Sequence, residues 1–110
     1  MYLARITRLE PLPGREAEVE QMADGLLTWL GQQEGYVAGM RLVSLDNPAD
    51  VSWISIWDSR AAADAAVNSQ HALSVYSQII TMAKGRAVNR EQFEVRNEIG
   101  LPVPKVKSSE

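Results

Sequence analysis

The chain has 110 residues, of which 45% are hydrophobic and 23% are charged, and its net charge is −3. This length suits one domain with one core, and the mixed charges form no basic stripe, so nucleic acid is not an expected partner. The chain has no cysteine, which excludes disulfides and thiolate chemistry. Arg5 and Arg8 break any signal-peptide core, and no apolar run approaches the ~20 residues that span a bilayer. We therefore expect a cytoplasmic protein without a membrane partner.

The first half of the chain predicts a strand followed by a long helix. Residues 2–9 form the strand, and the prolines and glycine of residues 11–14 end it because proline cannot donate to a sheet. Residues 15–33 predict a helix, because apolar side chains recur at three- and four-residue spacing. This stripe consists of Val19, Met22, Ala23, Leu26 and Leu30.

A hairpin follows, with strands at residues 36–45 and 51–58 and a turn at residues 46–50. Alternate side chains of a strand point to opposite faces, so Ile54 and Ile56 point one way and Val51, Trp53 and Trp57 the other. A sheet with helices on one side needs only one apolar face. The second apolar face must therefore bury against a partner chain, a ligand or both.

The second half predicts a helix at residues 59–66, a break at Asn68 and Ser69, a helix at residues 70–84 and a short strand at residues 91–96. Residues 1–98 are predicted as one domain and residues 99–110 as an extended tail. The element order is that of the α+β ferredoxin-like split β-α-β plan. It predicts a four-stranded antiparallel sheet with helices on one face and with the first and third strands in the centre.

Several short motifs follow one another along this plan: Pro13-Gly14, Glu34-Gly35-Tyr36, Ile56-Trp57-Asp58-Ser59, and the segment from His71 to Tyr76. In their order and spacing the sequence resembles the antibiotic biosynthesis monooxygenase family of the dimeric α/β-barrel superfamily. The resemblance covers residues 2–96. It implies a homodimer whose two sheets face each other, with a pocket in each subunit at the sheet face, either between the sheet and its helices or between the sheet and the partner sheet.

The resemblance also implies which side chains face the cavity. On the third strand these are Trp53, Ser55 and Trp57, which leaves Ile54 and Ile56 under the helices. On the first strand Arg5 and Thr7 face the cavity, together with Leu3, while Ala4 and Ile6 lie under the helices. The expected substrate-binding residues are Arg5, Thr7, Trp53, Ser55 and Trp57.

His71 and Tyr76 are the expected catalytic residues. His71 begins a helix, where the dipole favours the neutral ring, so the resemblance suggests a base or hydrogen-bond partner at the pocket rim. A helix-starting histidine without chemistry is the alternative. Tyr76 either donates a hydrogen bond to a quinone or phenol oxygen or holds its hydroxyl at the surface. No metal site is expected, because a single histidine without nearby carboxylates cannot provide one.

Three of the binding residues also have simpler roles open to them. Trp53 and Trp57 either stack on a planar ligand or pack in the core or dimer interface. A buried Arg5 guanidinium needs an anionic or carbonyl partner. This is either a ligand carboxylate or phenolate, or Glu94 or Glu91 on the last strand, and the ion pair is favoured.

The haem-degrading branch of the family relies on an asparagine, a tryptophan and a histidine where this chain has Thr7, Ala66 and Tyr76. Haem degradation is therefore not expected, and neither is any cofactor. The sequence leaves two functions open. One is a cofactor-independent monooxygenase acting on a small aromatic, phenolic or quinol substrate. The other is a non-catalytic dimer of the same fold that binds a ligand or a partner protein.

Overall fold

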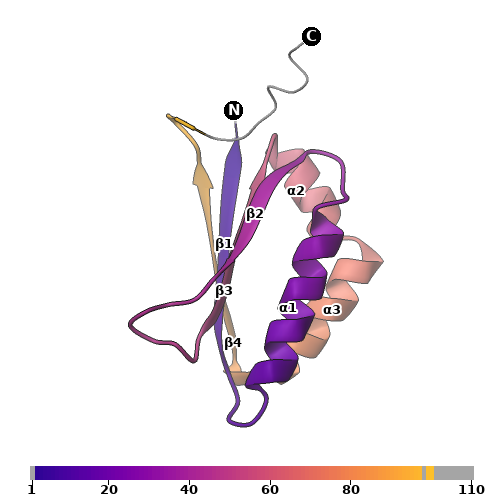
Figure 1. The fold of residues 1–110 in the computed structure, drawn as a ribbon. Coiled ribbons are helices and arrows are strands. Elements are labelled where there is room, and N and C mark those ends of the chain that lie inside the picture. The colour runs from indigo at the N-terminus through magenta and orange to yellow at the C-terminus, as the bar shows by residue number, and fades with distance from the viewer. Residues whose placement is uncertain (1, 98, 101–110) are drawn as a thin grey trace.

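The computed structural model describes residues 2–97, 99 and 100. The elements are β1 (Leu3–Pro11), α1 (Glu16–Leu30), β2 (Tyr36–Leu42), β3 (Val51–Trp57), α2 (Arg60–Val67), α3 (Gln70–Thr81) and β4 (Ala83–Glu94). The strands form one antiparallel sheet in the order β2-β3-β1-β4. All three helices lie on one face of it (Figure 1), and we call the other side the open face. The predicted α+β, ferredoxin-like fold with β1 and β3 in the centre is confirmed.

The predicted assignment of side chains to the two faces is wrong. Trp53, Ser55 and Trp57 lie under the helices and are almost fully buried, whereas Ile54 and Ile56 lie on the open face and are partly exposed. On β1, likewise, Arg5 and Thr7 face the helices, because they pair in register with Ser55 and Trp53. The alternation was correct and only its direction was reversed. Large indole rings fill the space between sheet and helices at the density that an interior requires.

The core lies between the sheet and the helices. From α1 it takes the apolar stripe that the sequence predicted, of which all but Met22 are buried: Val19, Ala23, Leu26 and Leu30. Small alanines of α2 and the larger Tyr76 and Ile79 of α3 complete it. The two shorter helices, α2 and α3, are capped by Ser59 and Ser69, whose side chains accept hydrogen bonds from the backbone N–H three residues on.

The last strand is much longer than predicted. It starts at Ala83, directly after α3 ends at Thr81, where the sequence favoured a continuing helix. Gly85 and Arg86 both have positive φ (65° and 53°), and the pairing with β1 shifts register between Leu9 and Pro11. An irregularity of this kind bends a strand, and here it lies at the start of β4, where the chain passes from α3 into the sheet.

The predicted domain boundary and the predicted cytoplasmic location both stay predictions. The predicted tail lies outside the described residues from 101 onward, so the domain boundary near residue 98 stays a prediction. None of the helices in the described part of the chain is long and apolar enough to cross a membrane. The cytoplasmic location also stays a prediction.

Candidate functional site

Six of the seven candidate residues lie together between the sheet and the helices. Five come from the central strands: Arg5, Thr7, Trp53, Ser55 and Trp57. Tyr76 joins them from α3, and its ring centroid lies 6.3 Å from that of Trp53. Each of the six is 7% exposed or less. We call this group the interlayer cluster.

Arg5 is the charged centre of the interlayer cluster. Its guanidinium donates to the Gln92 amide oxygen from both Nε and Nη2. Nη2 also lies 3.0 Å from the Asp64 carboxylate on α2, and Nη1 lies 3.5 Å from the Ala63 carbonyl. A buried charge of this kind requires a hydrogen-bonded counter-ion. The expected pair with Glu94 or Glu91 is therefore wrong, since Asp64 takes that place and Glu94 bonds Arg96.

Aromatic rings form the walls of the cluster. The Trp57 indole N–H donates to the Ser55 hydroxyl oxygen at 3.0 Å, which fixes the orientation of both side chains. The Tyr36 ring meets Trp57 edge-on at 5.3 Å between centroids. Burial raises the pKa of Tyr36 above its usual value, so this phenol stays protonated at neutral pH. Aromatic rings and one fixed cation are side chains of the kind that recognise a planar ligand with an anionic oxygen.

The cluster approaches solvent along β4. Gln92 and Arg90 are the β4 neighbours of Arg5 and Thr7, yet both are exposed whereas their β1 partners are buried. The Arg90 guanidinium carbon lies 4.7 Å from the centre of the Tyr76 ring, a cation–π contact. The two β4 side chains and half-exposed Asp64 therefore form the rim of the cluster.

Sequence reasoning missed these three rim residues. Recognising β4 as a full-length strand would have placed Arg90 and Gln92 on the same face as Arg5, because they alternate with Phe93 on the other face. Nothing local marks Asp64, which meets Arg5 only through the packing of α2.

His71 is the candidate that the structure separates from the others. It lies on α3 five residues before Tyr76, which is about 140° around the helix. Its ring stacks on Trp29 of α1, with 4.5 Å between centroids. The predicted catalytic pair of His71 and Tyr76 therefore does not share a pocket in this structure. Among the described residues, no group of three or more histidine, cysteine or acidic side chains could hold a metal ion.

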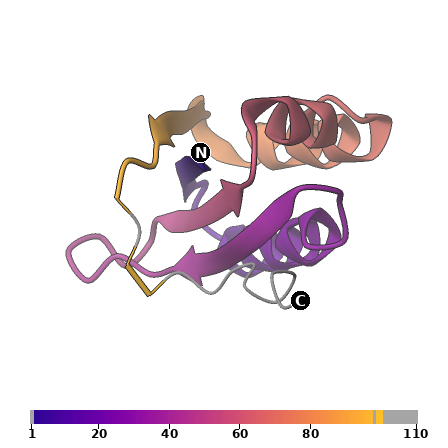
Figure 2. The same cartoon turned by 90° about the horizontal axis from the view of Figure 1, so that it is seen from above.

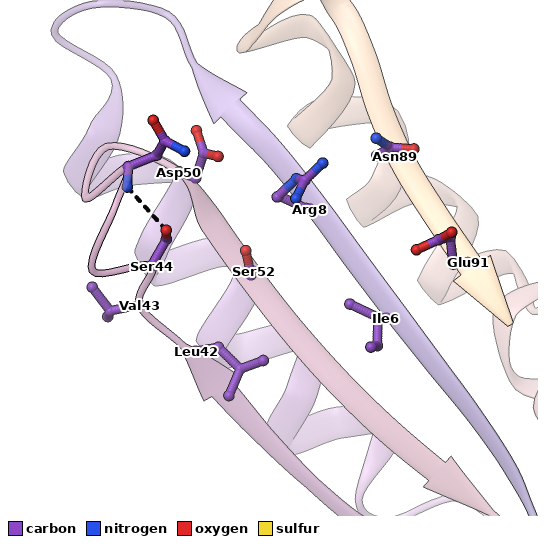
Figure 3. A pocket seen from close by; sticks show the side chains of 10 residues that line it. Ile6, Arg8, Leu42, Val43, Ser44, Asp50, Ser52, Asn89 and Glu91 are labelled. Carbon is purple, nitrogen blue, oxygen red and sulfur yellow. Dashed lines mark hydrogen bonds between the residues drawn. The ribbon is translucent and has the colours of Figure 1, made fainter. Parts of the chain in front are cut away.

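A second feature is a hollow on the open face, of about 440 Å³ (Figure 3). Arg8 lies in its middle, between Ser52 and Asn89, its neighbours in the sheet. One wall comes from the β2–β3 loop, residues 43–50. The full lining is Ile6, Arg8, Leu42, Val43, Ser44, Asn47, Asp50, Ser52, Asn89 and Glu91.

Comparison with known proteins gives a consistent result. A family model described as "Antibiotic biosynthesis monooxygenase" matches residues 2–76. Among solved structures, Rv0793 from Mycobacterium tuberculosis is similar, with a TM-score of 0.81 and 21% identity over 89% of this chain and 98% of that one. SnoaB, a cofactor-independent oxygenase from Streptomyces nogalater, has a TM-score of 0.76 and 17% identity, over 90% of this chain and 97% of its own.

A third similar structure is NE2512, a protein of unknown function from Nitrosomonas europaea. Its TM-score is 0.76 and its identity 24%, over 94% of this chain and 96% of that one. At these identities the likeness is one of fold. No curated protein matches the chain.

Proposed function

Because this chain belongs to the antibiotic biosynthesis monooxygenase family, we propose that it is a cofactor-independent oxygenase of a small planar phenol or quinol. The observation that carries the proposal is the interlayer cluster. A buried guanidinium and the buried rings of Trp53, Trp57 and Tyr76 lie in one layer between the sheet and the helices, which meets solvent at long polar side chains of β4. The cofactor-independent oxygenase SnoaB, which shares the fold, supports the same reaction class.

The proposed chemistry uses dioxygen as the oxidant. Loss of a proton from the substrate gives a carbanion stabilised by its ring oxygen, and this anion passes one electron to dioxygen. Recombination at the same carbon gives a peroxide anion, which takes back the proton removed in the first step and becomes a hydroperoxide. Loss of water then leaves a carbonyl, so one oxygen atom enters the product and the other leaves with two substrate hydrogens. The protein must bind a planar ring, stabilise its anion and accept a proton.

The cluster offers one group for each of these tasks. Arg5 stabilises the substrate anion, because its charge is fixed and little screened by water. Tyr76 donates a hydrogen bond to a second ring oxygen. Asp64, at the rim and bonded to Arg5, accepts the proton, whereas His71 lies on another side of α3. Entry of the ring requires Arg90 and Gln92 to move aside, and both are exposed.

Oxygen uptake with a panel of anthrones and quinols tests the proposal. We expect uptake of one dioxygen per ring oxidised by the wild-type protein. Tyr76→Phe and Asp64→Asn should lower turnover more than binding, because both keep the shape of the side chain. Arg41→Met is the matched control, since Arg41 also faces the helices from the sheet but pairs with Glu20 and Asp24 of α1. Unchanged turnover in both cluster variants would exclude this site.

The second function that the sequence left open also has an observation in its favour. In this structure the donors of Arg5 are already occupied by Gln92, Asp64 and the Ala63 carbonyl. A cluster satisfied in this way is suited to a non-catalytic ligand-binding dimer of the same fold. Such a protein would show a ligand-induced rise in melting temperature with the same quinols but no oxygen uptake.

We further propose that the chain is a homodimer joined through its open face. Large apolar side chains remain uncovered there, including Met40 at 51% exposure and Phe93 at 45%. Ile6, Ile54 and Ile56 between them are only partly buried. A contiguous apolar face of this kind is unusual on a monomer and typical of a protein–protein interface.

Light scattering tests the dimer. Ile54→Glu should convert it to a monomer that still folds, because Ile54 points away from the helices. The sequence alone would have selected Trp53 for this substitution, but Trp53 lies in the core, and a glutamate there would unfold the subunit. A wild-type monomer at micromolar concentration would contradict the proposal.

A further inference from the structure

The β2–β3 loop projects from the sheet on the side away from the helices. Figure 1 shows it reaching to the left beside the lower half of the sheet, opposite the helices, and Figure 2 shows it as the part of the chain furthest from the helices. The loop therefore lies on the side that a second copy would cover. It also forms one wall of the hollow on the open face.

The loop holds a defined shape although it exposes apolar side chains. The Ser44 hydroxyl oxygen accepts from the Asn47 N–H at 2.9 Å, and the Asn47 carbonyl accepts from the Asp50 N–H at 3.0 Å. Yet Leu45 is 93% exposed and Val43 59%. Burial of an exposed leucine lowers the free energy of association. A loop that already holds its shape also loses little conformational entropy on binding.

The hollow beside the loop offers complementary chemistry. Ile6 and Leu42 give it an apolar part, and Arg8 is the only cation among the described residues that line it. The ion pairs found among the described residues do not include Arg8, although Asp50 and Glu91 border the same hollow. A leucine followed by an acidic residue, Asp46, matches a hollow that combines apolar side chains with an arginine of this kind.

We propose that the β2–β3 loop is a docking arm that places Leu45 in the open-face hollow of a second copy of this chain. Each copy then supplies one arm and receives one, as a two-fold interface requires. The inference rests on the open-face dimer proposed above. Beyond that dimer, it identifies the residues that determine how the two sheets align.

Leu45→Ser tests the arm, with Leu73→Ser as its matched control. Leu73 is also an exposed leucine, at 53%, but it lies on α3 on the other side of the molecule. Two arms per dimer, each worth at least a factor of about ten, should raise the dimer dissociation constant about a hundredfold in Leu45→Ser. Leu73→Ser should leave it unchanged. Circular dichroism should show both variants folded.

The absence of cysteine from the chain allows a direct test of proximity. A Leu45→Cys chain mixed with an Asn89→Cys chain should form a disulfide-linked heterodimer under mild oxidation. A mixture of Leu73→Cys with Asn89→Cys should not. A wild-type dimer that Leu45→Ser does not weaken, together with no disulfide between the Leu45→Cys and Asn89→Cys chains, overturns the arm alone. A wild-type monomer instead removes the open-face dimer and the arm with it.

Discussion

Replacing Asp64 by alanine should destabilise this fold by about 2 kcal/mol, because it leaves the Arg5 guanidinium buried without its counter-ion. The Arg5 side chain is 5% exposed and the Asp64 side chain 50%. After the substitution the guanidinium keeps only the Gln92 amide oxygen and, at 3.5 Å, the Ala63 carbonyl. Both are neutral acceptors, so the charge itself is no longer balanced.

The expected size follows from how much water reaches each partner. Truncating one partner of a fully buried ion pair costs about 3–5 kcal/mol, and truncating an exposed pair costs less than about 1 kcal/mol. Asp64 is half exposed, which screens its attraction to Arg5 and gives the intermediate value. With a urea dependence of about 1–3 kcal/mol per molar, the unfolding midpoint should fall by about 1 M.

Asp24→Ala is the control. Asp24 is a helical carboxylate 58% exposed, and its Oδ1 lies 2.8 Å from Nε of Arg41. Arg41 is 21% exposed against 5% for Arg5, and it keeps Glu20 as a second counter-ion. The two variants therefore differ in the burial of the arginine and in the negative charge left beside it. The gain in helix propensity from alanine is the same in both and cancels. Asp24→Ala should cost less than about 1 kcal/mol, measured at the same protomer concentration. Equal losses in the two variants would refute the reasoning.

Three further outcomes are expected. Because burial raises the pKa of Tyr36 above 10.0, the unfolded chain ionises this phenol first, so the free energy of unfolding should fall as the pH rises above 10. Tyr36→Phe should reduce that fall in urea titrations at pH 8 to 11, and an unchanged slope would contradict it. Gly35→Ala should cost about 3 kcal/mol in thermal or urea unfolding, since Gly35 has φ 86° and a Cβ there would collide with Ala62; Gly14→Ala, at φ 87° in open space, should cost about 1 kcal/mol. Haem incubated with a reductant and the folded protein should keep its Soret band, because a tyrosine stands at Tyr76 where the haem degraders have histidine; protein-dependent bleaching would contradict this.

The sequence predicted the topology because its signals are local. The apolar stripe of α1 and the alternation in β3 follow from spacing, and the order of elements then leaves few possible sheets. The boundaries of α3 and β4 were not predictable in the same way. Residues 82–90 have no marked strand alternation, and β4 pairs there because β1 offers it a free edge. The register irregularity near Pro11 is a tertiary feature with no local sequence signal.

The direction of each face could not be derived from alternation alone. Alternation divides a strand into two sets but does not say which set lies under the helices. Arg5, Thr7 and Ser55 are polar, which argued for the cavity side. They are nevertheless buried under the helices, and the partners of Arg5 lie 59 and 87 residues away in the sequence. Such partners become visible only once the fold has brought them together.

The two apolar faces of β3 therefore have different roles, although they belong to one strand. Trp53, Ser55 and Trp57 pack against the chain's own helices and build the interlayer cluster, while Ile54 and Ile56 stay partly exposed on the open face, where we propose the dimer. Because neighbouring residues point in opposite directions, a substitution at one face leaves the other nearly untouched. Assembly and ligand chemistry can thus vary independently in this fold. Any coupling between them must pass through the backbone of β1 and β3, which both faces share.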